Sequence, residues 1–358
     1  MFDPSAAASP DSGIFGLTTS LEESQVVVVP VPFEATTSYG GGTSKGPAAV
    51  LAASRQVDLF DASTGRPYEA GIFMLKPAKD IRRHNRKAMK EAAGIIERGG
   101  QIAGDDRLER KLAKVNRRGE RVNEIVEATV RDQIRAGRLV ATLGGDHSAP
   151  FGAILAHAEA WPGLGILHVD AHADLRVAYE GFTWSHASIM YNVATRIPGV
   201  AKIVQVGIRD LSEEEFDFAS DSGGRVVIHH EDEVNRRRFN GEPWAHIARA
   251  IVDELPESVY VSFDIDGLDP ALCPHTGTPV PGGFSFAEAV ALIEAVVDSG
   301  RAIVGVDLCE IAPGPAGDEW DANVGARMLY KLIGFALKSR EDLQMPLSLR
   351  PTARLATE

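Results

Sequence analysis

Short apolar segments, rich in Val, Ile and Leu, recur along the chain and constrain its fold more than any other feature. Most of them do not alternate with polar residues, as strands with one wet face do. Continuous apolar runs of this length are typical of strands covered on both faces, as in a parallel sheet. We predict eight strands: Gln25–Val31, Ile72–Leu75, Leu139–Leu143, Leu164–Val169, Lys202–Val206, Val226–His229, Val259–Phe263 and Ile303–Val306.

Between these runs lie segments whose apolar residues follow helical spacing. In one of them Ser285 precedes Glu288 by three residues, which is the pattern of a capping box. Because strands and helices alternate, the sequence predicts a single α/β domain with helices on both faces of the sheet. The predicted helices are Asn85–Arg98, Val122–Ala136, Ser285–Ser299 and Asn323–Lys338.

Length and composition bound the class of protein. We expect one domain over residues 25–340, a flexible N-terminal tail at 1–24 and a C-terminal tail at 341–358. The net charge of −13 argues against a nucleic-acid partner, and the two cysteines exclude a disulfide scaffold. No apolar run approaches the roughly 18 residues that span a membrane, and the N-terminus lacks a secretory pattern. The expected location is the cytoplasm. The charge-rich segment 105–121 is interpreted as a solvated face.

Acidic and imidazole side chains follow four of the predicted strands. His147 follows the third strand, Asp170, His172 and Asp174 follow the fourth, Asp264 and Asp266 follow the seventh, and Glu310 follows the eighth. In open parallel α/β sheets, ligands bind just beyond the carboxyl ends of the strands. The sequence therefore predicts that these groups meet at one edge of the sheet.

The spacing of these groups favours metal binding. Asp170, His172 and Asp174 alternate with alanines, so an extended backbone places all three side chains on one side. Alone, such a motif fits a solvated loop equally well, but three motifs at three strand ends are hard to explain as caps. Four crowded carboxylates repel one another unless cations neutralise them. Two divalent ions would balance the charge, and oxygen-rich ligation favours Mn²⁺ or Mg²⁺, with zinc left open.

The motifs G-G-D-H-S at Gly144–Ser148, D-A-H-A-D at Asp170–Asp174 and S-F-D-I-D-G-L-D-P at Ser262–Pro270 resemble the ureohydrolase family, which includes arginase and agmatinase. The resemblance runs from about Val27 to about Leu337 and includes the G-T-P-V-P-G-G loop at Gly277–Gly283. It implies a three-layer α/β/α sandwich around a mainly parallel eight-stranded sheet. It also implies two Mn²⁺ per subunit, hydrolysis of a guanidino group to urea and an amine, and a homo-oligomer, either a trimer or a hexamer.

Residue roles follow from the same resemblance. Asp266 would handle a proton beside the attacking hydroxide, and His186 would move a proton to the leaving amine or to solvent. Glu310 would pair with the guanidinium, while Arg176, Trp184 and Thr278 are further candidate substrate contacts. Asp307 is a candidate for supporting the residues that contact metal or substrate, without contacting either itself. His168 is expected to pack within the sheet. The first metal ion would bind His147, Asp170, Asp174 and Asp264, and the second Asp170, His172, Asp264 and Asp266, so that Asp170 and Asp264 bridge.

The substrate is less well defined than the reaction. Arg176 stands where arginase carries an Asn, and the surrounding residues resemble the agmatinase branch, so agmatine is the leading substrate. Arg176 would instead suit the carboxylate of 4-guanidinobutyrate or 3-guanidinopropionate, unless it pairs with Glu180 or points away. Agmatinases often carry Glu where this chain has Val280. Guanidine and arginine also stay open as substrates.

Two interpretations from other classes of protein compete with a ureohydrolase. A single-zinc deacetylase on a related fold would not need the second acid of the Asp264-x-Asp266 pair. A non-catalytic regulatory relative would be expected to have lost metal ligands, whereas all six predicted ligands are present.

Overall fold

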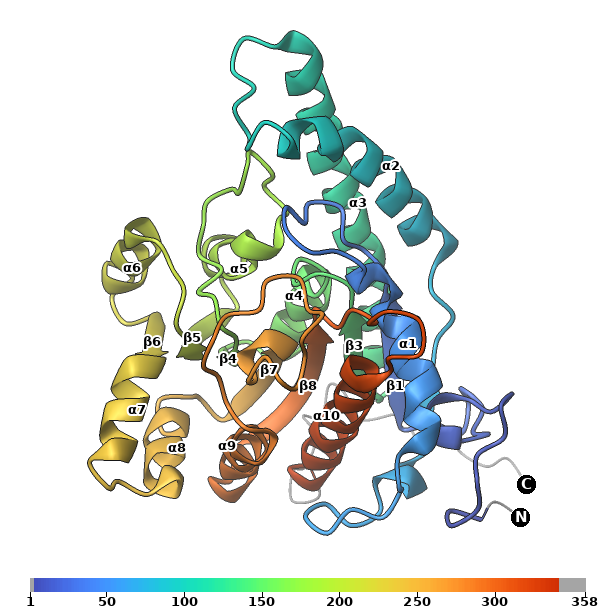
Figure 1. Cartoon of the computed structure of the whole chain (residues 1–358). Coiled ribbons are helices and arrows are strands. Elements are labelled where there is room, and N and C mark those ends of the chain that lie inside the picture. Colours follow the sequence, from blue (N-terminus) through green and yellow to red (C-terminus); the bar gives the residue numbers. More distant parts are fainter. Residues whose placement is uncertain (1–2, 341–358) are drawn as a thin grey trace.

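The computed structural model describes residues 3–340, in which strands and helices alternate along most of the chain (Figure 1). Each of the eight apolar runs forms a strand; β3 and β6 extend by one residue at one end, β7 extends by one residue at each end, and β5 and β8 extend further beyond their predicted bounds. The strands are β1 (Val26–Val31), β2 (Ile72–Met74), β3 (Leu139–Gly144), β4 (Leu164–Val169), β5 (Val200–Ile208), β6 (Val226–His230), β7 (Ser258–Asp264) and β8 (Ala302–Cys309).

The helices include all four that the sequence predicts. Ser285 and Glu288 form the predicted capping box at the start of α9. The helices in the described residues are α1 (Gly46–Ala53), α2 (Lys79–Ile96), α3 (Asp106–Arg135), α4 (Phe151–Ala160), α5 (Ile189–Arg196), α6 (Glu213–Ser220), α7 (Glu231–Phe239), α8 (Trp244–Val252), α9 (Phe286–Asp298) and α10 (Trp320–Lys338).

All eight strands form one parallel sheet in the order β2-β1-β3-β8-β7-β4-β5-β6. The chain passes from β3 to β4 across the sheet, and β8 and β7 later fill the gap between them. Such a reversal of strand order opens a crevice beyond the carboxyl ends of the neighbouring strands. The topology therefore marks β3, β8, β7 and β4 as the place for a site.

Alternating side chains of the strands fill two hydrophobic layers. Val26 and Val28 of β1 join the core formed with α1, α8, α9 and α10, whereas Val27 and Val29 join the core formed with α2, α3 and α4. A third hydrophobic cluster lies under α4 and α5 and includes Ile203 of β5. Because strand side chains point to opposite faces in turn, an all-apolar strand requires cover on both faces. The predicted three-layer α/β/α arrangement is confirmed.

Helix α3 begins at Asp106, well before the predicted start at Val122. The Asp105 side chain accepts the backbone N–H groups of Arg107 and Leu108 and so caps the helix. Leu108 and Val115 are buried among charged neighbours and continue the apolar stripe of the helix toward its start. The segment 105–121 is thus a charged amphipathic helix, and the high density of charge hid its apolar stripe from sequence reasoning.

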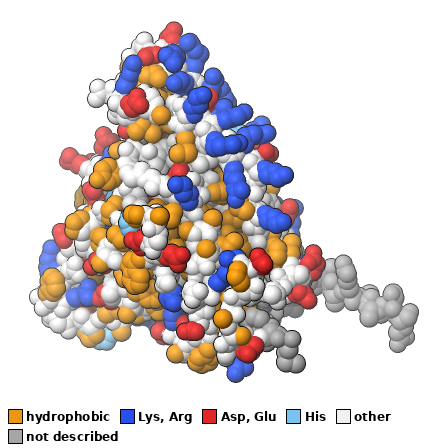
Figure 2. All heavy atoms as spheres, turned by 45° about the vertical axis from the view of Figure 1, so that its right-hand side comes forward, with side chains coloured by type: hydrophobic (Ala, Val, Ile, Leu, Met, Phe, Trp, Pro, Cys, Tyr) orange, Lys and Arg blue, Asp and Glu red, His pale blue; other side chains and the backbone are white. Residues whose placement is uncertain are grey.

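The charges of α2 and α3 gather on one outer surface. Figure 2 shows Lys and Arg side chains over the upper part of the molecule, where these two helices lie. On α2, the side chains of Lys79, Arg82, Arg86, Lys87 and Lys90 are exposed. Among the described residues, no helix combines the length and the apolar character needed to cross a membrane.

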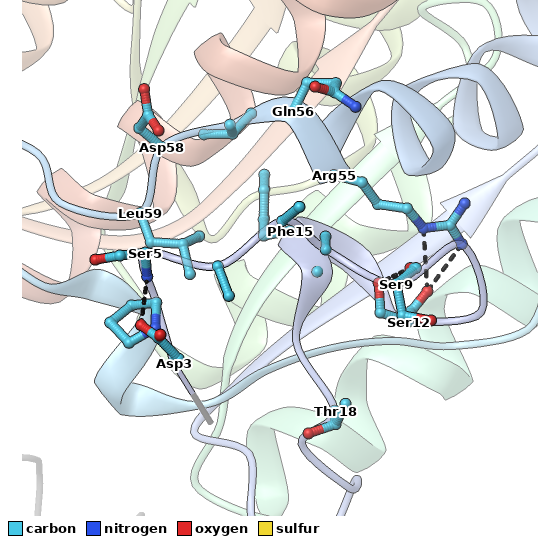
Figure 3. A pocket seen from close by; sticks show the side chains of 16 residues that line it. Asp3, Ser5, Ser9, Ser12, Phe15, Thr18, Arg55, Gln56, Asp58 and Leu59 are labelled. Carbon is cyan, nitrogen blue, oxygen red and sulfur yellow. Dashed lines mark hydrogen bonds between the residues drawn. The ribbon is translucent and has the colours of Figure 1, made fainter. Parts of the chain in front are cut away.

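The N-terminal segment differs from the predicted flexible tail, because it packs on the domain from residue 14 onward. Ile14, Phe15 and Leu17 are buried in the core, and the Phe15 ring lies 4.8 Å from that of Tyr330. Figure 3 shows Arg55 directed toward Ser12, whose backbone oxygen accepts two guanidinium hydrogen bonds. Burial of these apolar side chains is the physical reason for the difference. The predicted tail at 341–358 lies outside the described residues.

Candidate metal centre and guanidinium site

Four neighbouring strands bring the predicted site residues to one edge of the sheet. In the order β3, β8, β7 and β4, the strands are followed or ended by His147, Glu310, Asp264 and Asp170. These residues come from segments far apart in the sequence, and all four are buried. The parallel arrangement alone accounts for their meeting, since it places every carboxyl end at the same edge.

A first cluster converges on the ring of His147. Its Nδ1 atom lies 2.9 Å from Asp170 Oδ2, 3.2 Å from Asp264 Oδ2 and 3.5 Å from Asp174 Oδ2. A single nitrogen can share at most one proton with these three oxygens. The geometry therefore concentrates ligand atoms around one point, as a metal site does.

The opposite side of the His147 ring fixes its tautomer. Ser262 Oγ donates a hydrogen bond to Asp307 Oδ1 at 3.1 Å, so it accepts from His147 Nε2 at 2.9 Å. With the Nε2 hydrogen directed at Ser262, a neutral His147 ring would offer its Nδ1 lone pair to a metal ion among the carboxylates. A backing hydrogen bond of this kind is the usual support for a metal-binding histidine. Asp307 thus supports the site through Ser262.

A second cluster lies around His172. Its Nδ1 atom lies 3.2 Å from Asp266 Oδ2 and 3.5 Å from Asp170 Oδ1. Asp170 therefore presents one oxygen to each cluster, as expected of a bridging ligand. Asp264 presents Oδ2 to the first cluster, and its Oδ1 accepts the backbone N–H of Asp266 at 2.9 Å.

The electrostatics of both clusters favour bound cations. Burial and neighbouring carboxylates raise the pKa values of Asp264 and Asp174 well above their ordinary range. Burial opposes protonation of His172, yet Asp266 and Asp170 raise its pKa to about 12. Divalent ions would relieve the same repulsion without protons. The residues present therefore fit a metal centre.

Glu310 is placed beside the first cluster by a backbone that few residues adopt. Its φ is 63°, and that of Asp174 is 55°. Non-glycine residues in this region cost roughly 1–3 kcal/mol each and concentrate at functional sites. Glu310 Oε1 accepts the backbone N–H of His147 at 2.9 Å. Its Oε2 is buried and has no hydrogen-bond partner among the described residues. An unpaired buried oxygen of this kind invites a cationic donor.

A cavity of about 270 Å³ opens over the second cluster. Of the predicted site residues, His172, Asp174, His186, Arg176 and Thr278 line it. Trp184 does not line it, in contrast to the prediction that it contacts substrate. Its ring packs 4.8 Å from that of Phe151, and it borders Gly119 of α3, because the loop turns this side chain toward the helices.

Arg176 lies in the wall of the cavity but has partners of its own. Its Nε lies 3.5 Å from Glu215 Oε2, and its guanidinium carbon lies 5.3 Å from the centre of the Tyr179 ring. The predicted alternative partner, Glu180, is not the one that it contacts. The positive charge of Arg176 is thus balanced within the protein.

Two features of the site escaped sequence reasoning. His168, expected only to pack, contacts Asp170 Oδ2 through Nε2 at 2.9 Å, and Gln205 Nε2 holds its Nδ1 at 2.8 Å. Asp210 lines the cavity just beyond β5. Because that strand was predicted to end at Val206, Asp210 was not placed at the sheet edge. The strand-end rule would have found it with the correct boundary.

The structure combines an all-parallel α/β/α fold with a buried His/Asp cluster at the carboxyl edge of the sheet, which defines the class of α/β proteins with a candidate metal centre at the strand ends. The family model for arginases matches residues 24–334, and the chain belongs to the arginase family. The predicted ureohydrolase family is thereby confirmed.

Named relatives narrow the class of enzyme. The chain is 34% identical over 318 residues to an N(1)-aminopropylagmatine ureohydrolase of Thermus thermophilus, covering 88% of this chain and 92% of the relative. It is 31% identical over 298 residues to the agmatinase of Bacillus anthracis, covering 82% and 86%. Both relatives are ureohydrolases.

Solved structures agree on the fold. The agmatine ureohydrolase of Thermoplasma volcanium superposes with a TM-score of 0.68 at 24% identity, covering 90% of this chain and 92% of that one. The arginase of Bacillus cereus gives a TM-score of 0.62 at 23% identity, covering 87% and 98%.

Proposed function

We propose that the protein hydrolyses the guanidino group of agmatine, releasing urea and putrescine. The observation that carries this proposal is the buried, unpartnered Oε2 of Glu310 beside the His/Asp cluster, unpartnered among the described residues. A planar carboxylate and a planar guanidinium match through parallel hydrogen bonds. Gly277 leaves room for such a group, since a Cβ there would lie only 3.2 Å from Oε2.

Six residues would hold two Mn²⁺ ions: His147, Asp170, His172, Asp174, Asp264 and Asp266. Oxygen donors outnumber nitrogens in this set, and sulfur is absent from it, which favours manganese or magnesium. When bound, the ions would lower the pKa of a shared water so that hydroxide is available at neutral pH.

The remaining chemistry falls to side chains of this chain. Glu310 would fix the plane of the guanidinium and expose its central carbon. Asp266 would take a proton on its carboxylate beside that carbon. Desolvation lowers the pKa of His186 to about 4, so its ring is neutral near pH 7. A proton that it took up during the reaction would be passed on readily, because the protonated ring is a strong acid. Water supplies the oxygen of urea, and the amine leaves with the transferred proton.

N(1)-aminopropylagmatine is a second candidate substrate. The observation that favours it is the name of several relatives, among them the Thermus thermophilus enzyme. This compound shares the guanidino group of agmatine and carries a longer cationic tail. The acids 4-guanidinobutyrate and 3-guanidinopropionate are disfavoured, because Glu215 already balances Arg176. Homo-oligomeric assembly and a cytoplasmic location stay predictions.

The test is urea release from Mn²⁺-loaded protein with agmatine, N(1)-aminopropylagmatine, arginine, 4-guanidinobutyrate, 3-guanidinopropionate and guanidine, compared by kcat/KM. The proposal expects agmatine or its aminopropyl derivative to lead. The Glu310→Gln variant should lose at least about tenfold in kcat/KM, because a charged hydrogen-bond pair is lost. Leading activity on an acidic guanidino compound would contradict the proposed substrate, and no urea from any compound would contradict the reaction.

A further inference from the structure

The outer wall of the cavity carries one carboxylate that the described residues leave unpaired. Three carboxylates line the cavity: Asp174, which we propose as a metal ligand, and two others, Asp210 and Glu215. Glu215 is buried and fully engaged: its oxygens accept from Leu175 N, Ser212 N and Ser212 Oγ, and Oε2 faces Arg176. Asp210 is exposed, and no cation lies within ion-pair distance of it in residues 3–340.

Backbone contacts hold Asp210 beside the catalytic edge. Its N–H donates to the carbonyl of Ala171 at 3.1 Å, and Asp210 pairs with His172 in a parallel bridge. The neighbouring Arg209 is fixed at the same time, since its Nη2 donates to the carbonyl of Asp266 at 2.7 Å. The position of Asp210 relative to the second cluster is therefore set by main-chain bonds, while its own carboxylate stays available.

The rest of the wall is suited to a methylene chain. Leu211, Pro279 and Val280 line the cavity together with the rings of Tyr39 and Tyr179. Arg176 contributes a cation, but its pairing with Glu215 makes the two together neutral. Apart from the proposed metal ligands His172 and Asp174, the wall thus combines apolar surface and the neutral polar residues Ser38 and Thr278 with one uncompensated negative charge, that of Asp210.

We infer that Asp210 is the anchor for the distal ammonium of the substrate and so determines its class: a guanidine at one end, an alkyl chain, and a cation at the other. This inference rests on the proposed function. Glu310 does not line the cavity itself but lies behind Gly277, the neighbour of the lining residue Thr278; it would hold the guanidinium, and Asp210 would hold the other charged end. A substrate with a terminal carboxylate would instead place like charge against Asp210, and such repulsion is one source of specificity.

The experiment uses a pair of substrates that differ only in the distal charge. Agmatine carries an ammonium where 1-pentylguanidine carries a methyl group. In the Mn²⁺-loaded full chain, Asp210→Asn should lower kcat/KM for agmatine about fivefold through a higher KM, the upper end of what an exposed ion pair contributes. The same variant should change kcat/KM for 1-pentylguanidine by less than about twofold. The matched control is Asp217→Asn, an exposed acid of α6 that does not line the cavity.

The outcomes separate the two proposals. No urea from either compound with the unaltered protein would contradict the proposed function. If that protein cleaves agmatine but Asp210→Asn matches it, the inference about Asp210 is wrong. An equal loss on both substrates, or a loss in kcat with unchanged KM, would also overturn it, because Asp210 would then act only by positioning His172.

Discussion

The sheet edge and the α2–α3 pair are both rich in charge, yet they use it in opposite ways. At the edge, Asp170, Asp174 and Asp264 are buried and converge on one histidine nitrogen within 3.5 Å. On α2, Arg82 and Lys90 point to solvent, and no carboxylate lies within ion-pair distance of them among the described residues. Charge that is buried and convergent requires a partner, whereas charge that is spread over a helix surface is solvated.

The largest effect on activity is expected for a change in the proposed metal ligands. Asp264→Asn removes one charge from a site that we propose to hold two ions, so urea production should fall by about a thousandfold or more. Bound manganese, measured after desalting, should fall in parallel. Urea release within about tenfold of the unaltered protein would contradict the assignment of Asp264 as a ligand.

A smaller loss of activity is expected at His186, which we propose transfers a proton and does not bind metal. His186→Ala should lower kcat by about a hundredfold, the usual range for loss of a general acid or base. Bound manganese should not change, since His186 is not in either cluster. Unchanged turnover would remove the proton role, and lost metal would make His186 part of the metal site.

His157 is a third case beside the buried charges of the sheet edge and the solvated charges of α2 and α3. It is a buried titratable group that forms no ion pair among the described residues. Its Nδ1 donates to the carbonyl of Ala153, its Nε2 has no hydrogen-bond partner there, and burial lowers its pKa to about 4. The unfolded chain binds a proton near pH 6.5, so stability from His157 is complete above that pH and is lost as the pH falls toward 4. The loss amounts to about 3 kcal/mol.

The contribution of His157 is measured as the free energy of unfolding in denaturant at about pH 7 and about pH 4.5. Most of the titration of His157 falls between these two pH values. The variant His157→Gln keeps a donor for Ala153 and cannot be charged, so its stability should fall less between the two pH values. An equal fall in both proteins would show that His157 does not contribute to acid sensitivity.

The smallest effects are expected on α3, at two neighbouring residues. Asn116 holds the loop that carries Tyr179 and His186, since it donates to Gly181 O and accepts from Thr183 N. Asn116→Ala should cost about 1 kcal/mol of stability. Arg117→Gln alters only exposed charge and should stay within about 0.5 kcal/mol. Equal effects in thermal unfolding would contradict the distinction between contact and charge.

The same contrast explains what could be predicted from the sequence. The eight strands could be predicted because their apolar runs are continuous. The meeting of the candidate metal ligands could be predicted because the strand ends of a parallel sheet share one edge. The start of α3 was missed because Leu108 and Val115 stand among charges, and the packing of Phe15 because it depends on contacts with α10 and η3 (Ser54–Gln56).

Side-chain direction was harder to predict than position. Trp184 and Arg176 lie in the expected loop, but Trp184 faces α3 and α4, and Arg176 faces Glu215. Neither direction is encoded in residue spacing, because each depends on a partner from a distant segment. Asp210 was missed by an error of strand length rather than of principle.

The central claim is that the ends of β3, β8, β7 and β4 build one site for two metal ions. Elemental analysis of desalted, manganese-reconstituted protein tests it most directly, with Asp266→Asn alongside. We predict two ions per active chain and a drop toward one in the variant, whose altered residue belongs only to the second cluster. A single ion, most of all a single zinc, in protein that is fully active would contradict the account.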